Sequence, residues 1–162
     1  MEQEVELKLR MPAGYLRRLA RQPVIRDSVV GRPRTERLRT VYFDTPDQTL
    51  AQQGMALRVR QVGRHRVQTL KVGTDDNDGE AMQRHAEYSA PVRGNVPDLE
   101  RLGEVGLPER LRDGGAGELA EVFRTEVTRR TYPLSVNGSM IELAVDQGEI
   151  IAKDRQESVS EV

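Results

Sequence analysis

The stretch TYPLSVNGSMIELAVD, residues 131–146, decides the fold class. The dipeptide Asn137-Gly138 favours a two-residue type I′ turn, because both residue types tolerate a positive φ. After the turn, apolar residues alternate with charged or small ones. A period of two places successive side chains on opposite faces of a strand. The stretch therefore predicts a hairpin of antiparallel strands at 123–134 and 139–146.

The same period of two recurs on both sides of this hairpin. Residues 3–10 alternate strictly between apolar and charged side chains. Further strands are predicted at 34–44, 55–62, 66–72, 81–92 and 149–152, with a last one starting at residue 157.

Helical spacing of apolar residues predicts a few short helices. The first begins near Pro12 and stops before Pro23, since proline suits the first turn of a helix but not its interior. A second spans residues 48–53, and two or three more lie within 95–122. The order of elements predicts one α+β domain over residues 1–162, dominated by antiparallel strands.

Composition excludes several classes of protein. The 25 basic and 26 acidic residues nearly cancel, whereas a general nucleic-acid coat is clearly basic. The absence of Cys excludes disulfides and thiolate metal sites. The first residues do not read as a signal peptide, and no apolar run approaches the length of a membrane span. We expect a cytoplasmic protein with neither a membrane nor a nucleic-acid partner.

Several predicted strands combine an apolar face with a charged one. Between residues 57 and 60, for example, Leu57 and Val59 oppose Arg58 and Arg60. The simpler interpretation is an ordinary sheet face exposed to solvent. If the sheet closes into a barrel, however, the charged faces line its interior. Arg and Lys would then bind phosphate oxygens, and carboxylates would hold a hard cation such as Mg²⁺ or Mn²⁺.

The charged segments resemble the signature of the triphosphate tunnel metalloenzymes, the CYTH domain family. Glu4-x-Glu6-x-Lys8 resembles the family's ExExK motif, and residues 57–60 resemble its LRxR strand. Four further segments resemble family motifs in the family's order: Tyr42-Phe43-Asp44-Thr45, Leu70-Lys71, residues 123–129 and residues 141–149. The similarity is greatest to bacterial inorganic triphosphatases, in which a CYTH domain often precedes a helical CHAD domain.

The resemblance implies an eight-stranded antiparallel β-barrel, or tunnel, with short flanking helices. It also assigns roles to individual residues. The implied metal ligands, for Mg²⁺ or Mn²⁺, are Glu4, Glu6, Glu87 and Glu161. The implied phosphate ligands are Lys8, Arg58, Arg60, Lys71 and Arg129. Glu142 and Asp146 are implied to orient the attacking water or to serve the metal site.

The chain departs from the family pattern at two places. His85 stands where the family usually has an arginine, unless a bulge turns Arg84 inward. The chain also stops at Glu161-Val162, so we expect the last strand to be cut short, as in a fragment of a longer protein. A third position, Asp44, fits either a site residue or an Asp-Thr-Pro turn.

The implied activity is metal-dependent hydrolysis of inorganic triphosphate to pyrophosphate and phosphate. Adenylate cyclase and thiamine triphosphatase activities use similar tunnels, but the low aromatic content, 4%, favours the small inorganic substrate. A non-catalytic module that binds polyphosphate or a nucleotide is the alternative from another class. The third hypothesis is a β domain with a purely structural role.

Overall fold

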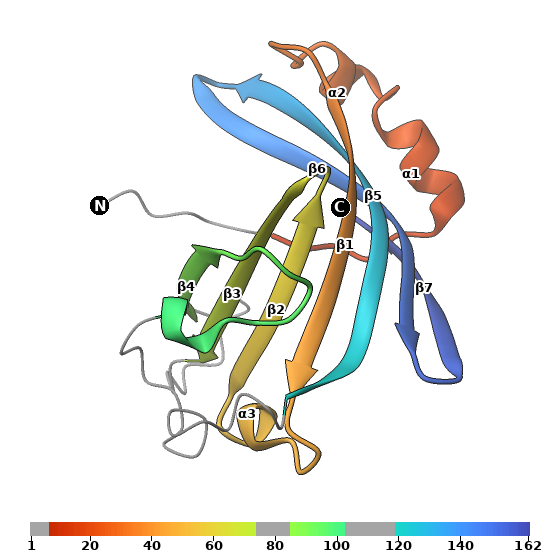
Figure 1. Ribbon diagram of the computed structural model, residues 1–162. Helices are drawn as coiled ribbons and strands as arrows, with labels where there is room; N and C mark the ends of the chain where they lie inside the picture. The colour runs from red at the N-terminus through yellow and green to blue at the C-terminus, as the bar shows by residue number, and fades with distance from the viewer. Residues whose placement is uncertain (1–6, 74–84, 103–118) are drawn as a thin grey trace.

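The computed structural model describes residues 7–73, 85–102 and 119–162. Its centre is one antiparallel sheet of seven strands in the order β4-β3-β2-β1-β5-β6-β7, strongly twisted and bent (Figure 1). The strands are β1 Arg34–Asp44, β2 Met55–Val62, β3 His65–Gly73, β4 His85–Pro91, β5 Ala120–Val136, β6 Ser139–Ala152 and β7 Arg155–Glu161.

The predicted hairpin is confirmed. β5 and β6 are the two longest strands, and Val136 pairs with Ser139 across the turn. Asn137 and Gly138 have φ values of 51° and 83°, as a type I′ turn requires at both central positions. β6 runs without interruption to Ala152, so the segment predicted at 149–152 is its continuation.

The helices are short and lie at the edges of the sheet. They are α1 Ala13–Leu19, α2 Pro23–Arg26, α3 Thr49–Gln52 and the 3-10 helix η1 Leu99–Leu102. The first predicted helix does stop before Pro23, but Pro23 itself begins α2, because its missing N–H is not needed in a first turn. None of the described helices is long and apolar enough to cross a bilayer.

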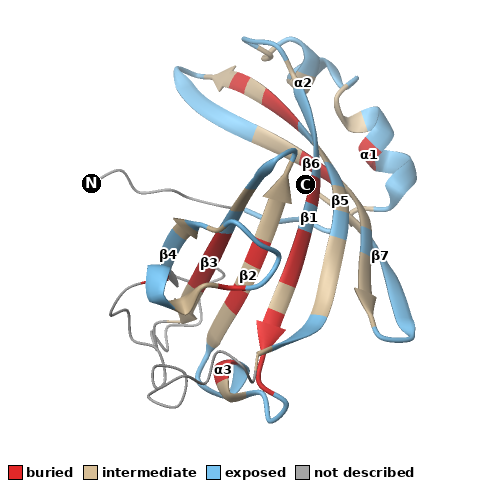
Figure 2. Ribbon diagram, in the orientation of Figure 1, coloured by how far each residue is buried: buried red, intermediate tan, exposed pale blue. Residues whose placement is uncertain are grey.

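Two apolar clusters lie on one face of the sheet, which we call the outer face. The register places Val41 beside Val59 and Leu57 beside Leu70, which puts these side chains on the same face. The first cluster consists of Val41, Phe43, Leu50, Leu57, Val59, Leu70 and Leu102. The second consists of Leu16 from α1 with Tyr132, Leu134 and Val145. Figure 2 marks buried segments on α1, on α3 and along several strands.

The opposite face, the inner face, is polar. By register it carries Thr40, Tyr42, Arg58, Arg60, Thr69, Lys71, Glu87, Arg129, Thr131, Asp146 and Glu161. Four of these polar side chains are buried, with relative exposures of 1% for Thr40, 4% for Thr69, 3% for Thr131 and 6% for Asp146. On a sheet face exposed to solvent, such residues would be accessible to water. The interpretation of the charged face as an ordinary solvent-exposed face is therefore wrong for the centre of this sheet.

The predicted closed barrel is not observed, because β4 and β7 remain at opposite ends of the strand order. The described part of the N-terminal segment lies antiparallel beside β7. Leu9 and Val162 exchange two backbone hydrogen bonds, at 2.6 and 2.9 Å, and Met11 donates to Ser160 at 2.9 Å. Alternation in sequence predicts a strand but not its partner, so closure could not be predicted from it.

The last strand, β7, pairs with β6 along its whole length. Its residues pair with β6 from Ala152 opposite Arg155 to Asp146 opposite Glu161.

The close approach of β5 and β6 explains why position 148 is glycine. A Cβ at Gly148 would overlap the carbonyl oxygen of Glu126 and lie 2.7 Å from Cα of Val127. We expect Gly148→Ala to lower the free energy of unfolding by about 1–3 kcal/mol, the usual range for overpacking. Urea unfolding measures this. Gly14→Ala is the control, since nothing lies within 4 Å of a Cβ there, and equal effects of the two substitutions would contradict the explanation.

Candidate functional site

Two arginines on β2, Arg58 and Arg60, lie at the centre of the inner face. Arg60 Nε donates a hydrogen bond to Thr40 Oγ1 on β1 at 3.1 Å. Arg58 Nε is buried and has no hydrogen-bond partner. Within the described ranges no carboxylate lies at ion-pair distance from either guanidinium. Among residues 7–73, 85–102 and 119–162, the two cations therefore have no counter-charge in direct contact.

The pKa of Arg60 reflects this close placement of two cations. Burial lowers the pKa of Arg60 most, and the positive charge of Arg58 lowers it further, while Tyr42 opposes them; Arg129 and Asp146 add smaller effects of opposite sign. Desolvation and like charges both disfavour a cation. An anion bound between these arginines would relieve both effects, so the geometry favours an anion-binding site.

Arg129 on β5 also faces inward, and it is paired. Its Nε and Nη2 donate to the two carboxylate oxygens of Asp146 on β6 at 2.8 and 2.7 Å. This is a bidentate, charge-assisted pair, the strongest common type of side-chain hydrogen bonding. The charges of Arg129 and Asp146 act in opposite directions on the pKa of Arg60.

The two predicted lysine ligands are paired in the same way. Lys71 Nζ on β3 lies 2.5 Å from Glu87 Oε1 on β4. Lys8 Nζ lies 2.8 Å from Glu161 Oε1 on β7. In each pair a predicted phosphate ligand contacts a predicted metal ligand, a feature that no spacing in the sequence indicated.

Glu87 is electrostatically linked to the arginines as well. The hydrogen bond from Lys71 lowers the pKa of Glu87, and the charges of Lys71, Arg58 and Arg60 lower it further, while burial opposes them. The predicted ligands on β2, β3 and β4 therefore face a common space on the inner face.

Glu142 is the predicted site residue that the structure does not bring to this cluster. It lies on β6 near the hairpin and contacts Arg34 at 3.4 Å, with both side chains exposed. Four residues along a strand separate it from Asp146, a distance of about 13 Å at about 3.3 Å per residue.

The predicted metal ligands are only partly within the structure. Glu4, Glu6 and Arg84 lie outside the described residues, and the backbone of His85 opens β4 opposite Gly73. No group of three Asp, Glu or His side chains that could hold a metal ion is found among residues 7–73, 85–102 and 119–162.

Two carboxylates nevertheless have a suitable placement for a metal. Asp146 and Glu161 are cross-strand partners on β6 and β7, both on the inner face. Carboxylate oxygens are the ligands that Mg²⁺ and Mn²⁺ prefer. Their carboxylate oxygens fit a hard divalent cation. In this structure, however, Asp146 forms an ion pair with Arg129, and Glu161 forms one with Lys8.

Asp44, which fitted two interpretations, has a structural role. Its carboxylate accepts hydrogen bonds from the backbone N–H groups of Thr45, Leu50 and Ala51 at 2.7, 2.9 and 3.0 Å. It thereby satisfies the donors at the start of α3. Thr40 is a site residue that the sequence pattern alone did not single out. Only its place on the same face as Arg60 could have indicated it.

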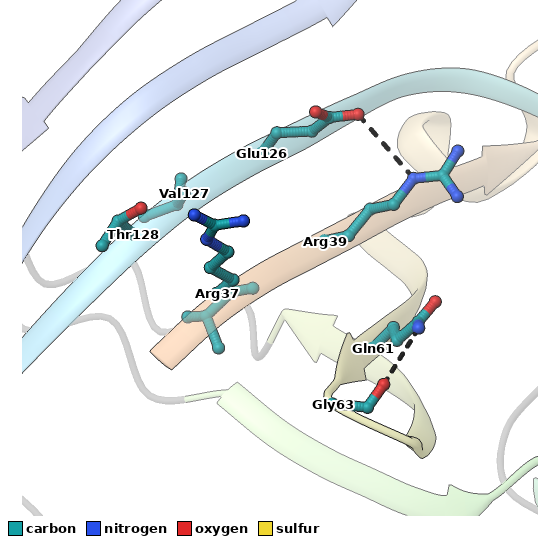
Figure 3. A pocket seen from close by; sticks show the side chains of 8 residues that line it. Arg37, Arg39, Gln61, Gly63, Glu126, Val127 and Thr128 are labelled. Atoms are coloured by element: carbon teal, nitrogen blue, oxygen red, sulfur yellow. Dashed lines mark hydrogen bonds and ion pairs between the residues drawn. The ribbon is translucent and has the colours of Figure 1, made fainter. Parts of the chain in front are cut away.

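A pocket of about 480 Å³ lies elsewhere, mainly on the outer face, between β1, β2 and β5 (Figure 3). Its charged lining consists of Arg37, Arg39 and Glu126, and Arg39 Nε lies 3.8 Å from Glu126 Oε1. The carboxylate of Glu126 in the pocket wall disfavours a polyanion, and the side chains of Arg39 and Glu126 are about half exposed to solvent. The inner-face arginines are the better anion site despite the hollow here.

Comparisons with known proteins identify the family of the chain. The CYTH domain family model matches residues 2–159. The chain belongs to the CYTH domain family. An inorganic triphosphatase from Haemophilus influenzae is 32% identical over 126 residues, which cover 77% of this CYTH chain and 34% of that protein. The chain thus spans about a third of the length of this relative.

Solved structures share the fold of this CYTH chain. A protein from Hippeastrum, described as an adenylyl cyclase that reveals a dominant triphosphatase activity, superposes with a TM-score of 0.59 at 20% identity, over 95% of this chain and 76% of the other. A Bacillus halodurans protein described as an adenylate cyclase gives a TM-score of 0.51 at 18% identity, over 96% and 76%. These identities support the fold alone.

The lowered pKa of Glu87 predicts a stability contribution that depends on pH. Because the folded-state pKa lies below the ordinary value of 4.5, the Lys71–Glu87 pair adds stability above that value and loses it as the pH falls through the folded-state pKa. We expect wild type to exceed Glu87→Gln in urea midpoint near neutral pH, with a difference that shrinks as the pH drops below 4.5. A difference that grows in acid would contradict this sign.

Proposed function

We propose that this CYTH domain hydrolyses inorganic triphosphate to pyrophosphate and orthophosphate on its inner face. The observation that carries the proposal is the pair Arg58 and Arg60, two partly desolvated cations with no carboxylate contact among the described residues. Such an arrangement is costly without an anion and favourable with one. Arginine also matches phosphate geometry with two parallel N–H donors.

The other predicted cations surround this pair. Lys71, Arg129 and Lys8 each lie on the inner face and would bind further phosphate oxygens once they leave their carboxylates. A triphosphate carries several negative charges along a short chain, which suits a row of cations on adjacent strands. The 32% identity to a protein named inorganic triphosphatase supports the choice of substrate.

Catalysis of phosphoryl transfer is mostly positioning and charge neutralisation. A water oxygen attacks the terminal phosphorus while the bridging P–O bond breaks. Pyrophosphate leaves with the electron pair of that bond, and the water's proton passes to an inner-face carboxylate. Asp146 is our choice for that carboxylate, since Glu142 lies near the hairpin.

A divalent ion fits the same proposal. Mg²⁺ or Mn²⁺ held by carboxylates from the set Glu4, Glu6, Glu87, Asp146 and Glu161 would neutralise charge on the phosphates when bound. The inner-face residues of this chain bind and orient the phosphates. We propose that residues 1–162 perform this as one domain in the cytoplasm.

Release of phosphate tests the proposal directly. We expect turnover of inorganic triphosphate in Mg²⁺ or Mn²⁺, slower turnover of ATP and thiamine triphosphate, and none in EDTA. Tight binding of triphosphate or polyphosphate without turnover would favour the binding module instead. If the protein neither binds nor hydrolyses these compounds, both the triphosphatase and the binding module are rejected.

Arg60 offers the most direct substitution. We expect Arg60→Gln to lower kcat/KM for triphosphate by roughly 10- to 100-fold, because a hydrogen bond to a charged group contributes about 1.5–3 kcal/mol. Arg39→Gln on the neighbouring strand is the matched control, since it removes the same charge from the outer face. Steady-state phosphate release measures both variants. Equal losses in the two would mean that net charge, not the inner face, governs binding.

A further inference from the structure

We infer that two hydroxyl groups beside Arg58, those of Thr69 and Ser89, complete a subsite for one terminal phosphate group on the inner face. The inference rests on the proposed function and deepens it, because it assigns one end of the triphosphate to a place on the sheet. It concerns the binding of phosphate alone and requires neither a metal ion nor the opening of an ion pair.

Arg58, Thr69 and Ser89 lie in one cross-strand row. Arg58 on β2 is the register partner of Thr69 on β3, and Thr69 is the partner of Ser89 on β4. The three strands are neighbours in the sheet (Figure 1). Directly opposite residues have Cβ atoms about 4.5–5.5 Å apart. One tetrahedral anion can therefore contact the guanidinium of Arg58 and the hydroxyl next to it.

The two hydroxyls form a hydrogen-bonded pair. Thr69 Oγ1 and Ser89 Oγ are 3.0 Å apart, and either atom can be the donor. A hydroxyl has one proton and two lone pairs, so the bond between two hydroxyls leaves one proton for a further acceptor. Thr69 is buried, with a relative exposure of 4%, whereas Ser89 is exposed. The pair therefore connects solvent at Ser89 with the buried surroundings of Arg58.

The neighbouring arginine shows what this row lacks. Arg60 Nε donates to the hydroxyl of Thr40 at 3.1 Å. Arg58 Nε, in contrast, is buried and has no hydrogen-bond partner, although Thr69 is its neighbour on the next strand. A buried donor without an acceptor costs free energy. An anion between Arg58 and Thr69 would serve as the acceptor for both side chains.

The hydroxyl pair suits a phosphate that carries a proton. Toward an unprotonated oxygen, Ser89 donates to Thr69 and Thr69 donates to the anion. Toward a P–OH group the direction reverses, because Thr69 accepts from the anion and donates to Ser89, whose proton goes to water. Terminal phosphate groups and orthophosphate take up a proton near neutral pH, whereas the internal group of triphosphate is more acidic. The row therefore fits a terminal group.

Sulfate is the probe that isolates this property. In mildly alkaline buffer, orthophosphate is mainly the hydrogen phosphate dianion, which has the charge and tetrahedral shape of sulfate and one proton more. A site built from cations alone binds both anions alike. The hydroxyl pair can donate to either anion but can accept only from phosphate. We expect wild type to bind phosphate roughly 2- to 12-fold more tightly than sulfate, the range for one additional hydrogen bond.

NMR chemical-shift titrations of the full chain with sodium phosphate and with sodium sulfate measure both dissociation constants. EDTA is present throughout, so that no metal ion contributes. The amides whose signals move report where the anion binds. We expect the largest changes on β2 and β3, around Arg58 and Thr69.

Ser89→Ala and Thr69→Val are the test variants. In Ser89→Ala, Thr69 can still donate to either anion, but its buried proton has no acceptor when it accepts from phosphate. Sulfate binding should therefore stay at the wild-type level, while phosphate binding weakens to that of sulfate. Thr69→Val keeps the shape of the side chain and removes its hydroxyl. It should weaken the binding of both anions and abolish the preference.

Thr131→Val is the matched control. It makes the same substitution on the same face at a similar burial, since Thr131 is 3% exposed. Arg58 pairs with Tyr42, and Tyr42 pairs with Phe123 on β5. Thr131 lies eight residues beyond Phe123 along β5, about 26 Å at about 3.3 Å per residue. This variant should bind both anions as wild type does.

The affinities decide whether the subsite exists. Equal affinities of wild type for phosphate and sulfate overturn it, and so does a wild-type preference that persists in Ser89→Ala. Loss of the preference in Thr131→Val also overturns it, since the hydroxyl pair would not be the cause. Signals that move only away from Arg58 and Thr69 would mean an adventitious ion only. If Thr69→Val does not fold, Ser89→Ala decides, because Ser89 is exposed.

Turnover separates this inference from the proposed function. Hydrolysis of triphosphate by a wild type that does not prefer phosphate to sulfate rejects the subsite and keeps the proposed function. A preference for phosphate without any hydrolysis of triphosphate rejects the proposed function and keeps a phosphate-binding subsite.

Discussion

The two arginines held side by side on β2, Arg58 and Arg60, impose the constraint on which this structure depends. Desolvation and mutual repulsion both oppose their charged state, as the lowered pKa of Arg60 records. Nothing among the described residues contacts either guanidinium with an opposite charge. Their placement therefore has to be stabilised by interactions elsewhere in the sheet.

The outer face supplies that stabilisation. Leu57 and Val59 alternate with the arginines along β2 and belong to the larger apolar cluster. Leu57 is fully buried and Val59 almost so, so β2 is fixed by hydrophobic contacts on one side while it presents charge on the other. The described helices that join the apolar clusters contribute Leu16, Leu50 and Leu102, all to the outer face.

Much of this could be predicted from the sequence, because it follows from local periodicity. Alternation identified the strands and their charged faces, and Asn137-Gly138 identified the hairpin turn. The family resemblance implied a closed barrel, which the described sheet does not form. A period of two could not have settled this, since it does not specify which edges meet. The ion pairs could not be predicted either. Arg129 lies 17 residues from Asp146 in the sequence, and only the register of β5 and β6 brings the two side chains together. Glu142 and Asp146 share a face in sequence, yet distance along β6 separates them.

Burial, more than residue type, separates the charges that matter here from those that do not. Arg39 and Glu126 on the outer face are about half exposed and 3.8 Å apart, so water screens their attraction and the pair contributes little. Arg129 and Asp146 make a bidentate contact with Asp146 almost buried, where an unpaired charge would be costly. Breaking the pair of Arg129 with Asp146 would therefore cost much more free energy than breaking the exposed pair of Arg39 with Glu126.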